Sequence, residues 1–579
     1  MEDILEIINN QQISFLSELT NNMIHKLIKN IALQNSPVIF FTALYEENLK
    51  CLHAQLNYLN IDNQLMLREE KILKNIVLIN KELLYQYYVK KDNINLADII
   101  IFYNSEVGNS YYQLIYQIYH QYQKLDKRLP RMILLDEGYI NNKTIFTKNN
   151  KNSYHYVSKK PEIHYSKKNF YINSPELLNE LTSNVNNKEK YAQHLLIVPS
   201  KDYFYMASKK IKEKFKDFDV YTFDENIHQN SKNIIFTPLK NKNRIIITVH
   251  KCAALINFID LKYIYDCCQS NDIFYGDSFV KYVSQNTANH IAKESKKYVF
   301  RACPEKAFRH LEITDNYHLS LENNSKLILR AYQNDQDVSI DNEDTIVKFL
   351  ERINLIRAGR VLNRSQNILS IPLGLRAANF IFVWAGKNLP VFPALVLSVI
   401  IDQCKNSLLY IPDTVEDHQE FIMTHYKKTR DDNIIIFYLN ILLLFLTEKK
   451  DLNIDKEIIK KWCDKNYIYY NTFNHLLNKL IETVIACRNY YNFDLALYDS
   501  KNVLDKAKSI LMDIYSDDIC ESYDKIEHIY HDKNANSVIL DKKRFNSGYF
   551  FFPERFISFF RINTPKSHDI SLFYLIIED

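Results

Sequence analysis

The scarcity of glycine is the sequence feature that most restricts what this chain can fold into and do. Seven glycines occur among 579 residues, whereas an average protein has about 7% glycine. The two that lie nearest to one another are Gly374 and Gly386. A phosphate-binding GxxxxGK[ST] loop, a GxGxxG dinucleotide turn and a GxSxG nucleophile elbow all need glycines much closer together than this. The chain therefore lacks these three motifs in their standard form.

The remaining composition indicates an AT-rich genome and reduced thiols. Tyrosine (41) and phenylalanine (33) are abundant, and asparagine, isoleucine and lysine occur throughout; the codons of these residues are rich in A and T. A large DNA virus, a cytoplasmic plasmid or an intracellular parasite would have such a genome. The nine cysteines include no CxxC pair, which argues against a metal site or a disulfide framework.

Neither a signal peptide nor a membrane span is expected. The first ten residues carry acids instead of a basic segment. The most apolar run, residues 433–447, is shorter than the ~18–20 residues that cross a bilayer, and predicts a buried core helix. The formal net charge is +4 with interspersed charges, which leaves room only for a local basic groove. We expect an intracellular, cytoplasmic or virion-associated protein with no membrane partner.

The first 300 residues alternate short apolar runs with longer amphipathic stretches. This pattern is typical of buried parallel strands joined by helices, and it predicts two consecutive α/β domains. The runs are Pro37–Phe41, Asn75–Ile79, Asp98–Phe102, Arg131–Leu135, His194–Val198, Asn233–Phe236, Arg244–Thr248 and Tyr263–Tyr265.

After about residue 312 the pattern changes to apolar residues at three- and four-residue spacing, which predicts helices. From about Tyr530 the pattern alternates again and predicts a small β unit. The expected helices are Glu343–Leu362, Ala377–Gln403, Asp431–Glu448, Asp455–Asp464 and Phe473–Tyr490, and the expected strands are Ser537–Leu540, Gly548–Phe552 and Phe556–Ile562.

This order of elements is similar to that of the DEAH-box helicases of superfamily 2. Residues 244–266 resemble, without a gap, the motif V strand of that family and the strand after it, and end on the matching Asp266. Residues 284–297 resemble motif VI. The matching residues of motif VI are Ser284, Gln285, Ala288 and Asn289.

The residues with which that family binds and hydrolyses nucleotide are replaced throughout. The first strand leads into residues 42–50, which contain Glu46 and Glu47 but no glycine. The other replaced positions are Tyr103, Asn104 and Glu106 in the Walker B motif, Val249 and His250 in motif V, and Ile291, Glu294 and Lys297 at the motif VI arginines. Because hydrolysis needs phosphate, magnesium and transition-state contacts together, we expect no cofactor and no catalytic residue.

The resemblance implies two RecA-like domains, a winged-helix and ratchet-like helical region, and a C-terminal OB-like domain. The corresponding ranges are 1–170 and 171–312 for the RecA-like domains, 313–412 for the winged-helix-like region, 413–510 for the ratchet-like domain and 511–579 for the OB-like domain.

Several stretches permit both a functional and a structural interpretation. Leu134–Glu137 could be the true Walker B strand, His250 a catalytic base, and Cys267 with Cys268 a redox pair. The tyrosines of residues 111–122 could stack on bases. We favour the structural interpretation in each case. Leu134–Glu137 is then a strand that ends in a solvated acidic turn, and His250 is a histidine without a catalytic partner. The two cysteines are buried thiols, and the tyrosines pack in the core on one face of a helix.

The arginines of the helical region are the best candidates for nucleic-acid contacts, because lysine is the common cation in this composition. They are Arg352, Arg357, Arg360 and Arg376; a solvated helix face is the alternative. We therefore expect an inactive helicase-like protein that binds single-stranded RNA or DNA, or protein partners, in a viral-type transcription, replication or RNA-processing assembly. The alternatives are a purely structural subunit and a divergent ATP-dependent RNA helicase.

Overall fold

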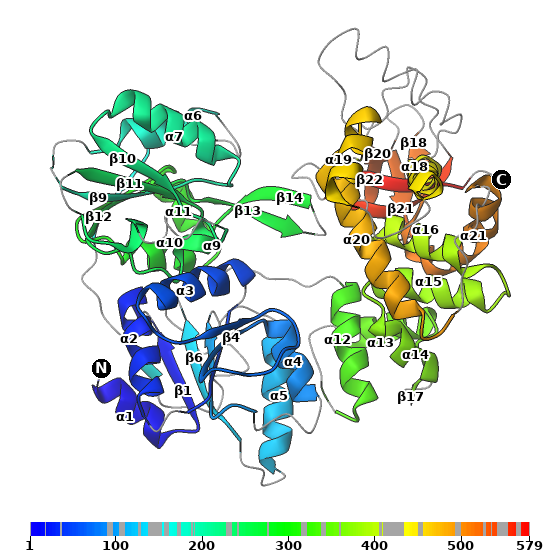
Figure 1. Cartoon of the computed structure of the whole chain (residues 1–579), viewed down its shortest axis with the longest axis horizontal. Helices are drawn as coiled ribbons and strands as arrows, with labels where there is room; N and C mark the ends of the chain where they lie inside the picture. Colours follow the sequence, from blue (N-terminus) through cyan, green and yellow to red (C-terminus); the bar gives the residue numbers. More distant parts are fainter. Residues whose placement is uncertain are drawn as a thin grey trace. The chain divides into compact units, whose positions relative to one another are not determined.

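The structure, a computed structural model, describes most of the chain in two compact units (Figure 1). The described residues are 2–577 without 90–95, 104–109, 125–128, 137–152, 156–160, 171–174, 227–233, 314–320, 339–342, 404–407, 409–433, 450–454, 492–499, 525–528, 541–553, 563–568 and shorter gaps of one or two residues. Unit 1 comprises residues 1–273, 278–319 and 334–340, and unit 2 comprises residues 274–277, 320–333 and 341–579.

Unit 1 begins with a seven-stranded sheet in which all neighbouring strands are parallel. In spatial order the strands are β3 (Gln64–Met66), β4 (Ile76–Ile79), β2 (Ile39–Thr42), β5 (Ile99–Tyr103), β6 (Arg131–Asp136), β1 (Ile13–Ser17) and β7 (Ser153–His155). The helices of this part are α1 (Glu2–Asn10), α2 (Asn21–Ala32), α3 (Glu46–Tyr58), α4 (Lys81–Val89) and α5 (Ser110–Lys124).

A second parallel sheet of six strands follows in the same unit. Its spatial order is β10 (Phe218–Thr222), β11 (Asn243–Thr248), β9 (Gln193–Ile197), β12 (Leu261–Asp266), β15 (Tyr298–Arg301) and β8 (Glu162–Tyr165). Its helices are α6 (Pro175–Ser183), α7 (Tyr203–Lys214), α9 (His250–Ala253), α10 (Gln285–Ala292) and α11 (Glu305–Arg309). Strands β13 (Gln269–Phe274) and β14 (Asp277–Tyr282) pair separately.

Seven of the eight predicted apolar runs contain strands of these two sheets, because strands buried on both faces read as continuous apolar sequence. The exception is Asn233–Phe236: residues 234–236 form a helical turn, in which Ile235 and Phe236 are buried. A short apolar run alone does not separate a strand from a buried helical turn. Strands β1 and β10 escaped prediction because polar residues interrupt them.

Strand β8 belongs to the second sheet although it precedes residue 170, the predicted end of the first RecA-like domain. It pairs with β15, with Glu162 opposite Tyr298 and Tyr165 opposite Arg301. Strand order is set by tertiary pairing, so a strand can join the sheet of the domain that follows it in the sequence.

The described residues of unit 2 from Leu321 to Asp518 form mainly helices, with one short hairpin among them. The expected helix 343–362 ends at Arg352, and a short hairpin follows; the expected helix 377–403 is interrupted between Ala385 and Val391. The elements are α12 (Leu321–Gln333), α13 (Glu343–Arg352), β16 (Ile356–Arg357), β17 (Arg360–Val361), α14 (Asn363–Ser370), α15 (Leu375–Ala385), α16 (Val391–Gln403), α18 (Ile434–Lys449), α19 (Lys456–Lys465), α20 (Tyr470–Cys487), α21 (Ser500–Ile514) and the 3₁₀ helix η2 (Ser516–Asp518).

A closed five-stranded barrel completes unit 2. The barrel order is β18 (Ile519–Asp524), β19 (Ile529–Asp532), β20 (Ser537–Leu540), β22 (Asp569–Ile576) and β21 (Arg555–Ile562). The predicted strands 537–540 and 556–562 are present, and the predicted strand Gly548–Phe552 lies outside the described residues.

The apolar helix α18 is a core helix, as predicted: Ile435, Leu439 and Phe445 are fully buried. Within the described ranges, no single helix combines the length and the apolar character that a bilayer span needs. The helices α14 and α15 reach that length only as a pair bent by 119°.

Candidate functional site

The candidate site is the boundary between the two parallel sheets of unit 1. In open parallel sheets, ligands bind beyond the carboxyl ends of the strands, at the point where the strand order reverses. In the first sheet that point lies between β2 and β5, since β4 lies on the other side of β2. The residues that follow β2 and end β5 therefore occupy the position of a nucleotide site.

The turn after β2 carries negative charge where a phosphate would be bound. Helix α3 begins with Glu46 and Glu47, and carboxylates at a helix N-terminus occupy the place that favours an anionic ligand. The amide of Asn80 donates to Glu46 Oε1 at 2.8 Å. Lys81 is buried beside these acids, and this burial lowers its pKa to about 8 although Glu82, Glu46 and Glu47 oppose the shift. Three carboxylates and one buried lysine thus lie at this turn.

Residues 251–257 of the second sheet's domain, which we call the seam segment, are held by side chains of the first sheet's domain. Five of its seven backbone carbonyls each accept a hydrogen bond from that domain. The pairs are Asn48 Nδ2 to Lys251 at 2.5 Å, Tyr103 Oη to Ala254 at 3.2 Å, His25 Nε2 to Leu255 at 2.9 Å, Asn21 Nδ2 to Ile256 at 2.9 Å and Gln55 Nε2 to Asn257 at 2.8 Å.

Three of these five carbonyls, those of Ala254, Leu255 and Ile256, belong to buried residues, where a backbone group without a partner is costly. Gln55 makes the most complete contact, because its Oε1 also accepts the backbone N–H of Asn257 at 3.0 Å. Burial lowers the pKa of His25 to about 4, although its bond to the Leu255 carbonyl opposes the shift. The imidazole of His25 is therefore neutral in the seam at physiological pH.

Helix α10, which carries the motif VI resemblance, faces the same seam. His290 Nε2 lies 3.1 Å from Asn21 Oδ1 and 2.9 Å from the Ala254 carbonyl, and its ring packs edge-on against Tyr103. Ile291 is buried in the core of the second sheet. Tyr103 and Ile291, two positions that the helicase resemblance aligns with catalytic groups, are therefore both buried packing residues.

Glu294, which the helicase resemblance aligns with an arginine, meets the start of α2. Its Oε1 accepts the backbone N–H of Asn21 at 2.8 Å. Desolvation raises the pKa of Glu294 to about 7, although the bond from Asn21 and the charge of Lys293 lower it. An arginine finger stabilises anionic charge, whereas this side chain contributes either a neutral carboxyl or a negative charge.

The two hydrophobic cores also interlock at the seam. Cys51 of α3 packs in the core of the second sheet, and Leu255 of the seam segment packs in the core of the first. Tyr58 of α3 contacts Phe236 with ring centroids 5.4 Å apart. Hydrogen bonds and apolar packing therefore both join the two domains within unit 1.

A depression of about 740 Å³ borders the seam, and two of the lysines that line it form ion pairs. Lys296 bonds Asp260 at 2.7 Å, and Lys297, which the resemblance aligns with an arginine, bonds Glu189 at 2.9 Å. Glu189 also accepts from Lys262 and Tyr263, and these hydrogen bonds lower its pKa to about 2. Lys297 thus belongs to a surface cluster around Glu189.

His250 lies in a buried hydrogen-bonded group with Asp266 and Cys267. His250 Nε2 is 2.8 Å from Asp266 Oδ1, which also accepts the Cys268 N–H at 2.7 Å. Burial opposes ionisation of Asp266, but His250 and Arg301 outweigh it and lower the pKa of Asp266. A nitrogen, an oxygen and a sulfur here lie within 4.8 Å of one another and could hold a metal ion. In the structure they bond to one another and to the backbone.

The remaining predicted positions divide into buried residues and residues outside the description. Val249 is buried at the start of α9. The tyrosines of α5 are buried, which confirms core packing in place of base stacking. Asp136 ends β6 and is buried. Asn104, Glu106 and Glu137 lie outside the described residues.

The four candidate arginines, all in unit 2, differ in their surroundings. Arg376 forms ion pairs with Glu322 and Asp518, and Arg352 with Asp517. The guanidinium of Arg376 also lies 4.3 Å from the Tyr515 ring centroid. Arg357 and Arg360 stand opposite one another in the β16–β17 hairpin and are exposed. Two of the four arginines are therefore held by carboxylates, and two face solvent.

Sequence reasoning missed the residues that make the seam, namely Asn21, His25, Asn48 and Gln55. Asparagine is common throughout this chain, and each of these residues lies on an ordinary amphipathic helix. The one local signal is that the four residues fall on the apolar faces of α2 and α3, where they are buried. A buried amide or imidazole requires a partner, but the sequence does not name it.

Comparisons with known proteins agree with this architecture. No protein-family model matches the chain, and no curated protein matches it in sequence. Among solved structures, the crystal structure of the Escherichia coli DExH-box NTPase HrpB superposes with a TM-score of 0.63 at 10% identity, over 100% of this chain and 68% of that one. The chain therefore has a helicase-like fold, and the two parallel sheets of unit 1 are RecA-like α/β domains.

Proposed function

We propose that this chain is a helicase-fold protein that neither binds nor hydrolyses nucleotide and serves as a nucleic-acid-binding or scaffolding subunit of a larger assembly. The observation that carries the proposal is the occupied seam: five carbonyls of residues 251–257 are bonded by five side chains of the first sheet's domain. In a nucleotide-dependent helicase, these two domains separate and close around ATP.

The chemistry of the seam supports the same conclusion. Hydrolysis of ATP needs magnesium ligands, phosphate donors and cations that stabilise transition-state charge. Here Tyr103 donates its hydroxyl to a backbone carbonyl, Ile291 is buried, and Glu294 adds a carboxyl group. Each of these groups is unsuited to a polyphosphate, and Glu46 and Glu47 at the start of α3 repel it.

Unit 2 supports the binding role. Arg357 and Arg360 are exposed on the β16–β17 hairpin and could contact phosphates of single-stranded RNA or DNA. We propose that residues 313–412, with helices α12–α16 and this hairpin, correspond to a winged-helix-like region. Residues 413–510, with helices α18–α20, then correspond to a ratchet-like domain, and residues 511–579, with the closed barrel, to an OB-like domain. The AT-rich composition supports a source such as a large DNA virus.

Isothermal titration with ATP and magnesium tests the first part of the proposal. We expect no heat of binding at micromolar to millimolar ATP, and no phosphate release in the presence of single-stranded RNA. A micromolar dissociation constant, or RNA-stimulated hydrolysis that survives purification, would overturn it and support a divergent helicase.

Retention on single-stranded nucleic acid tests the second part. We expect binding that is indifferent to sequence and weakens steeply with salt, by about 0.7 in log affinity per log salt for each phosphate contacted. Absence of retention at low salt favours the purely structural subunit, for which the carboxylate pairing of Arg352 and Arg376 is the supporting observation. Co-purification from the native source then identifies the protein partners.

A further inference from the structure

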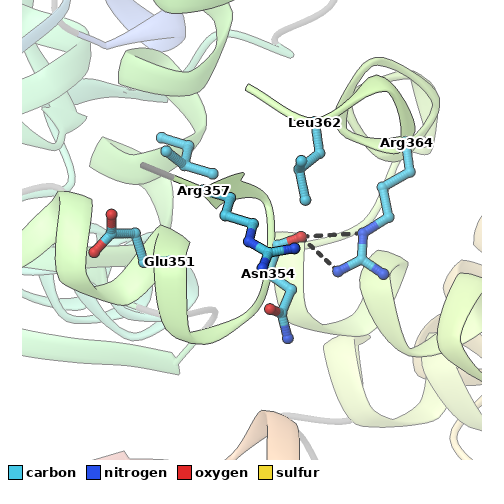
Figure 2. A pocket seen from close by; sticks show the side chains of 6 residues that line it. Glu351, Asn354, Arg357, Leu362 and Arg364 are labelled. Atoms are coloured by element: carbon cyan, nitrogen blue, oxygen red, sulfur yellow. Dashed lines mark hydrogen bonds between the residues drawn. The ribbon is translucent and has the colours of Figure 1, made fainter. Parts of the chain in front are cut away.

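The β16–β17 hairpin of unit 2 forms one wall of a pocket into which two arginines extend. The pocket has a volume of about 710 Å³ and is lined by Glu351, Asn354, Ile356, Arg357, Leu362 and Arg364. Figure 2 shows the side chains of Arg357 and Arg364 extending toward Asn354 from opposite sides. Arg364 has no place in the helicase resemblance.

The local backbone fixes the positions of both arginines. Asn354 adopts a left-handed conformation, with φ of 56°, at the turn after α13. The backbone N–H of Leu355 then bonds to the Leu350 carbonyl at 2.8 Å, and the buried hydroxyl of Ser365 donates to the Leu355 carbonyl at 2.8 Å. Helix α14 is thereby tied to the turn, so Arg357 from β16 and Arg364 from α14 share one pocket.

Arg364 is oriented by a hydrogen bond that leaves its charge uncompensated. Its Nε donates to the Asn354 carbonyl at 3.0 Å, and its Nη2 donates to the same oxygen (Figure 2). A guanidinium has five N–H donors in a fixed fork, so this carbonyl uses two and leaves donors for a second acceptor. Burial lowers the pKa of Arg364, but the guanidinium remains charged because its ordinary pKa exceeds 12.

Arg357 adds a second positive charge. It is exposed, and no carboxylate of the described residues forms an ion pair with either Arg357 or Arg364. The pocket has one acid, Glu351, on α13. Leu362, the N-cap residue of α14, gives the helix no side-chain acceptor. Two guanidinium groups and a helix N-terminus without a capping side chain favour an anion.

We infer that Arg357 and Arg364 together bind one phosphate group of a single-stranded nucleic acid backbone. Bidentate donation from arginine matches the oxygens of a phosphate, while Ile356 and Leu362 give the pocket an apolar wall for the adjoining sugar or base. The inference rests on the proposed nucleic-acid-binding function and assigns it to a place.

Fluorescence anisotropy of the full chain with a labelled oligouridine 20-mer, over a range of salt concentrations, tests the inference. The variants are Arg357→Ala, Arg357→Lys and Arg357→Ala with Arg364→Ala; the control is Arg309→Ala, because Arg309 is an exposed arginine of unit 1 that pairs only with exposed Glu305. We expect the double variant to bind roughly tenfold more weakly at low salt and to reduce the salt slope by about 0.7, the value for one phosphate. Arg357→Lys keeps the slope but loses part of the affinity, and the control is unchanged.

The possible outcomes separate the inference from the proposed function. Wild-type binding that the double variant retains overturns the pocket assignment and leaves the nucleic-acid function intact. Absence of wild-type binding overturns both. A third experiment is a titration with pyrophosphate. Tight binding of pyrophosphate that oligouridine does not displace would show that the pocket takes a small phosphorylated ligand. This result would overturn the inference that the pocket binds a phosphate of a nucleic-acid backbone. Among the described residues, the side chain of Arg357 has no hydrogen-bond or ion-pair partner, so Arg357→Ala alone gives a result even if the double variant is unstable.

Discussion

The seam of unit 1 and the arginine pocket of unit 2 differ in how their polar groups are partnered. At the seam, five backbone carbonyls accept hydrogen bonds from five side chains that are all buried. In the pocket, Arg357 is exposed and Arg364 is held only by a neutral carbonyl. A buried hydrogen-bond network stabilises one arrangement, whereas an uncompensated charge at a surface is available to a ligand. The polar groups of the seam therefore hold two domains together, whereas those of the arginine pocket leave donors for a ligand.

The arginines of unit 2 themselves provide the strongest test of this contrast. Arg376→Ala leaves the carboxylates of Glu322 and Asp518 without their partner in a poorly solvated cluster, and removing one member of such a pair costs about 3–5 kcal/mol. Arg357→Ala should leave stability unchanged within about 0.5 kcal/mol. Hydrogen exchange of peptides from α15 measures both effects. Equal protection in the two variants would show that Arg376 is no more structural than Arg357.

Asn21 is the side chain at which the seam is most easily broken. Asn21→Ala removes the bond to the Ile256 carbonyl and the contact with His290, both buried. Leaving buried groups unsatisfied costs about 1–3 kcal/mol each, so we expect a loss of about 2–4 kcal/mol and faster amide exchange in residues 251–257. Asn22→Ala, one position away on α2, is the matched control. If exchange in residues 251–257 stays at the wild-type rate, the seam is not held by these bonds.

Glu294 gives the seam a pH dependence of known sign. The pKa of Glu294 in the folded chain is about 7, against an ordinary value of 4.5. The contribution of Glu294 to the free energy of unfolding is therefore fully present below pH 4.5 and is lost as the pH rises through 7. Glu294→Gln removes this loss and keeps an oxygen that can accept the Asn21 N–H. The stability of the variant relative to the wild type should therefore increase between pH 4.5 and pH 7, by up to about 3 kcal/mol.

Urea unfolding of both proteins from pH 5 to pH 8.5 measures that difference. The buried His25 and His194, with pKa values lowered to about 4 and about 3, destabilise both proteins alike below pH 6.5 and cancel in the comparison. A difference that is flat across the range would contradict a buried carboxyl at this position.

The smallest expected effect concerns Tyr103, which the helicase resemblance aligns with an acid of the Walker B motif. Tyr103→Phe deletes the hydroxyl that bonds to the Ala254 carbonyl, but His290 also bonds to that carbonyl. We expect a loss of about 1 kcal/mol in urea unfolding and no gain of ATP binding. Tyr103→Asp places a carboxylate in a buried position and should cost more. A Tyr103→Asp variant that is as stable as wild type and binds magnesium would contradict this expectation.

The sequence determined the elements and excluded a standard nucleotide site. Continuous apolar runs such as Ile76–Ile79 and Ile99–Tyr103 predict buried parallel strands because both faces of such a strand are covered. The spacing of seven glycines excludes a phosphate loop, since no other residue allows that close backbone approach at low cost. Both inferences use properties of single residues and of their neighbours in the chain.

Tertiary structure alone decided which side chains meet at the seam and which arginines stay free of a carboxylate partner among the described residues. The carbonyls of residues 251–257 meet Asn21, His25, Asn48, Gln55 and Tyr103 only because two sheets far apart in sequence are brought together. Arg376 and Arg357 carry the same charge in the sequence, but Glu322 and Asp518 reach one and not the other. Hydrogen bonds and ion pairs between residues far apart in the chain depend on the distance between the two groups in space and on their burial. The local sequence around either residue encodes neither quantity.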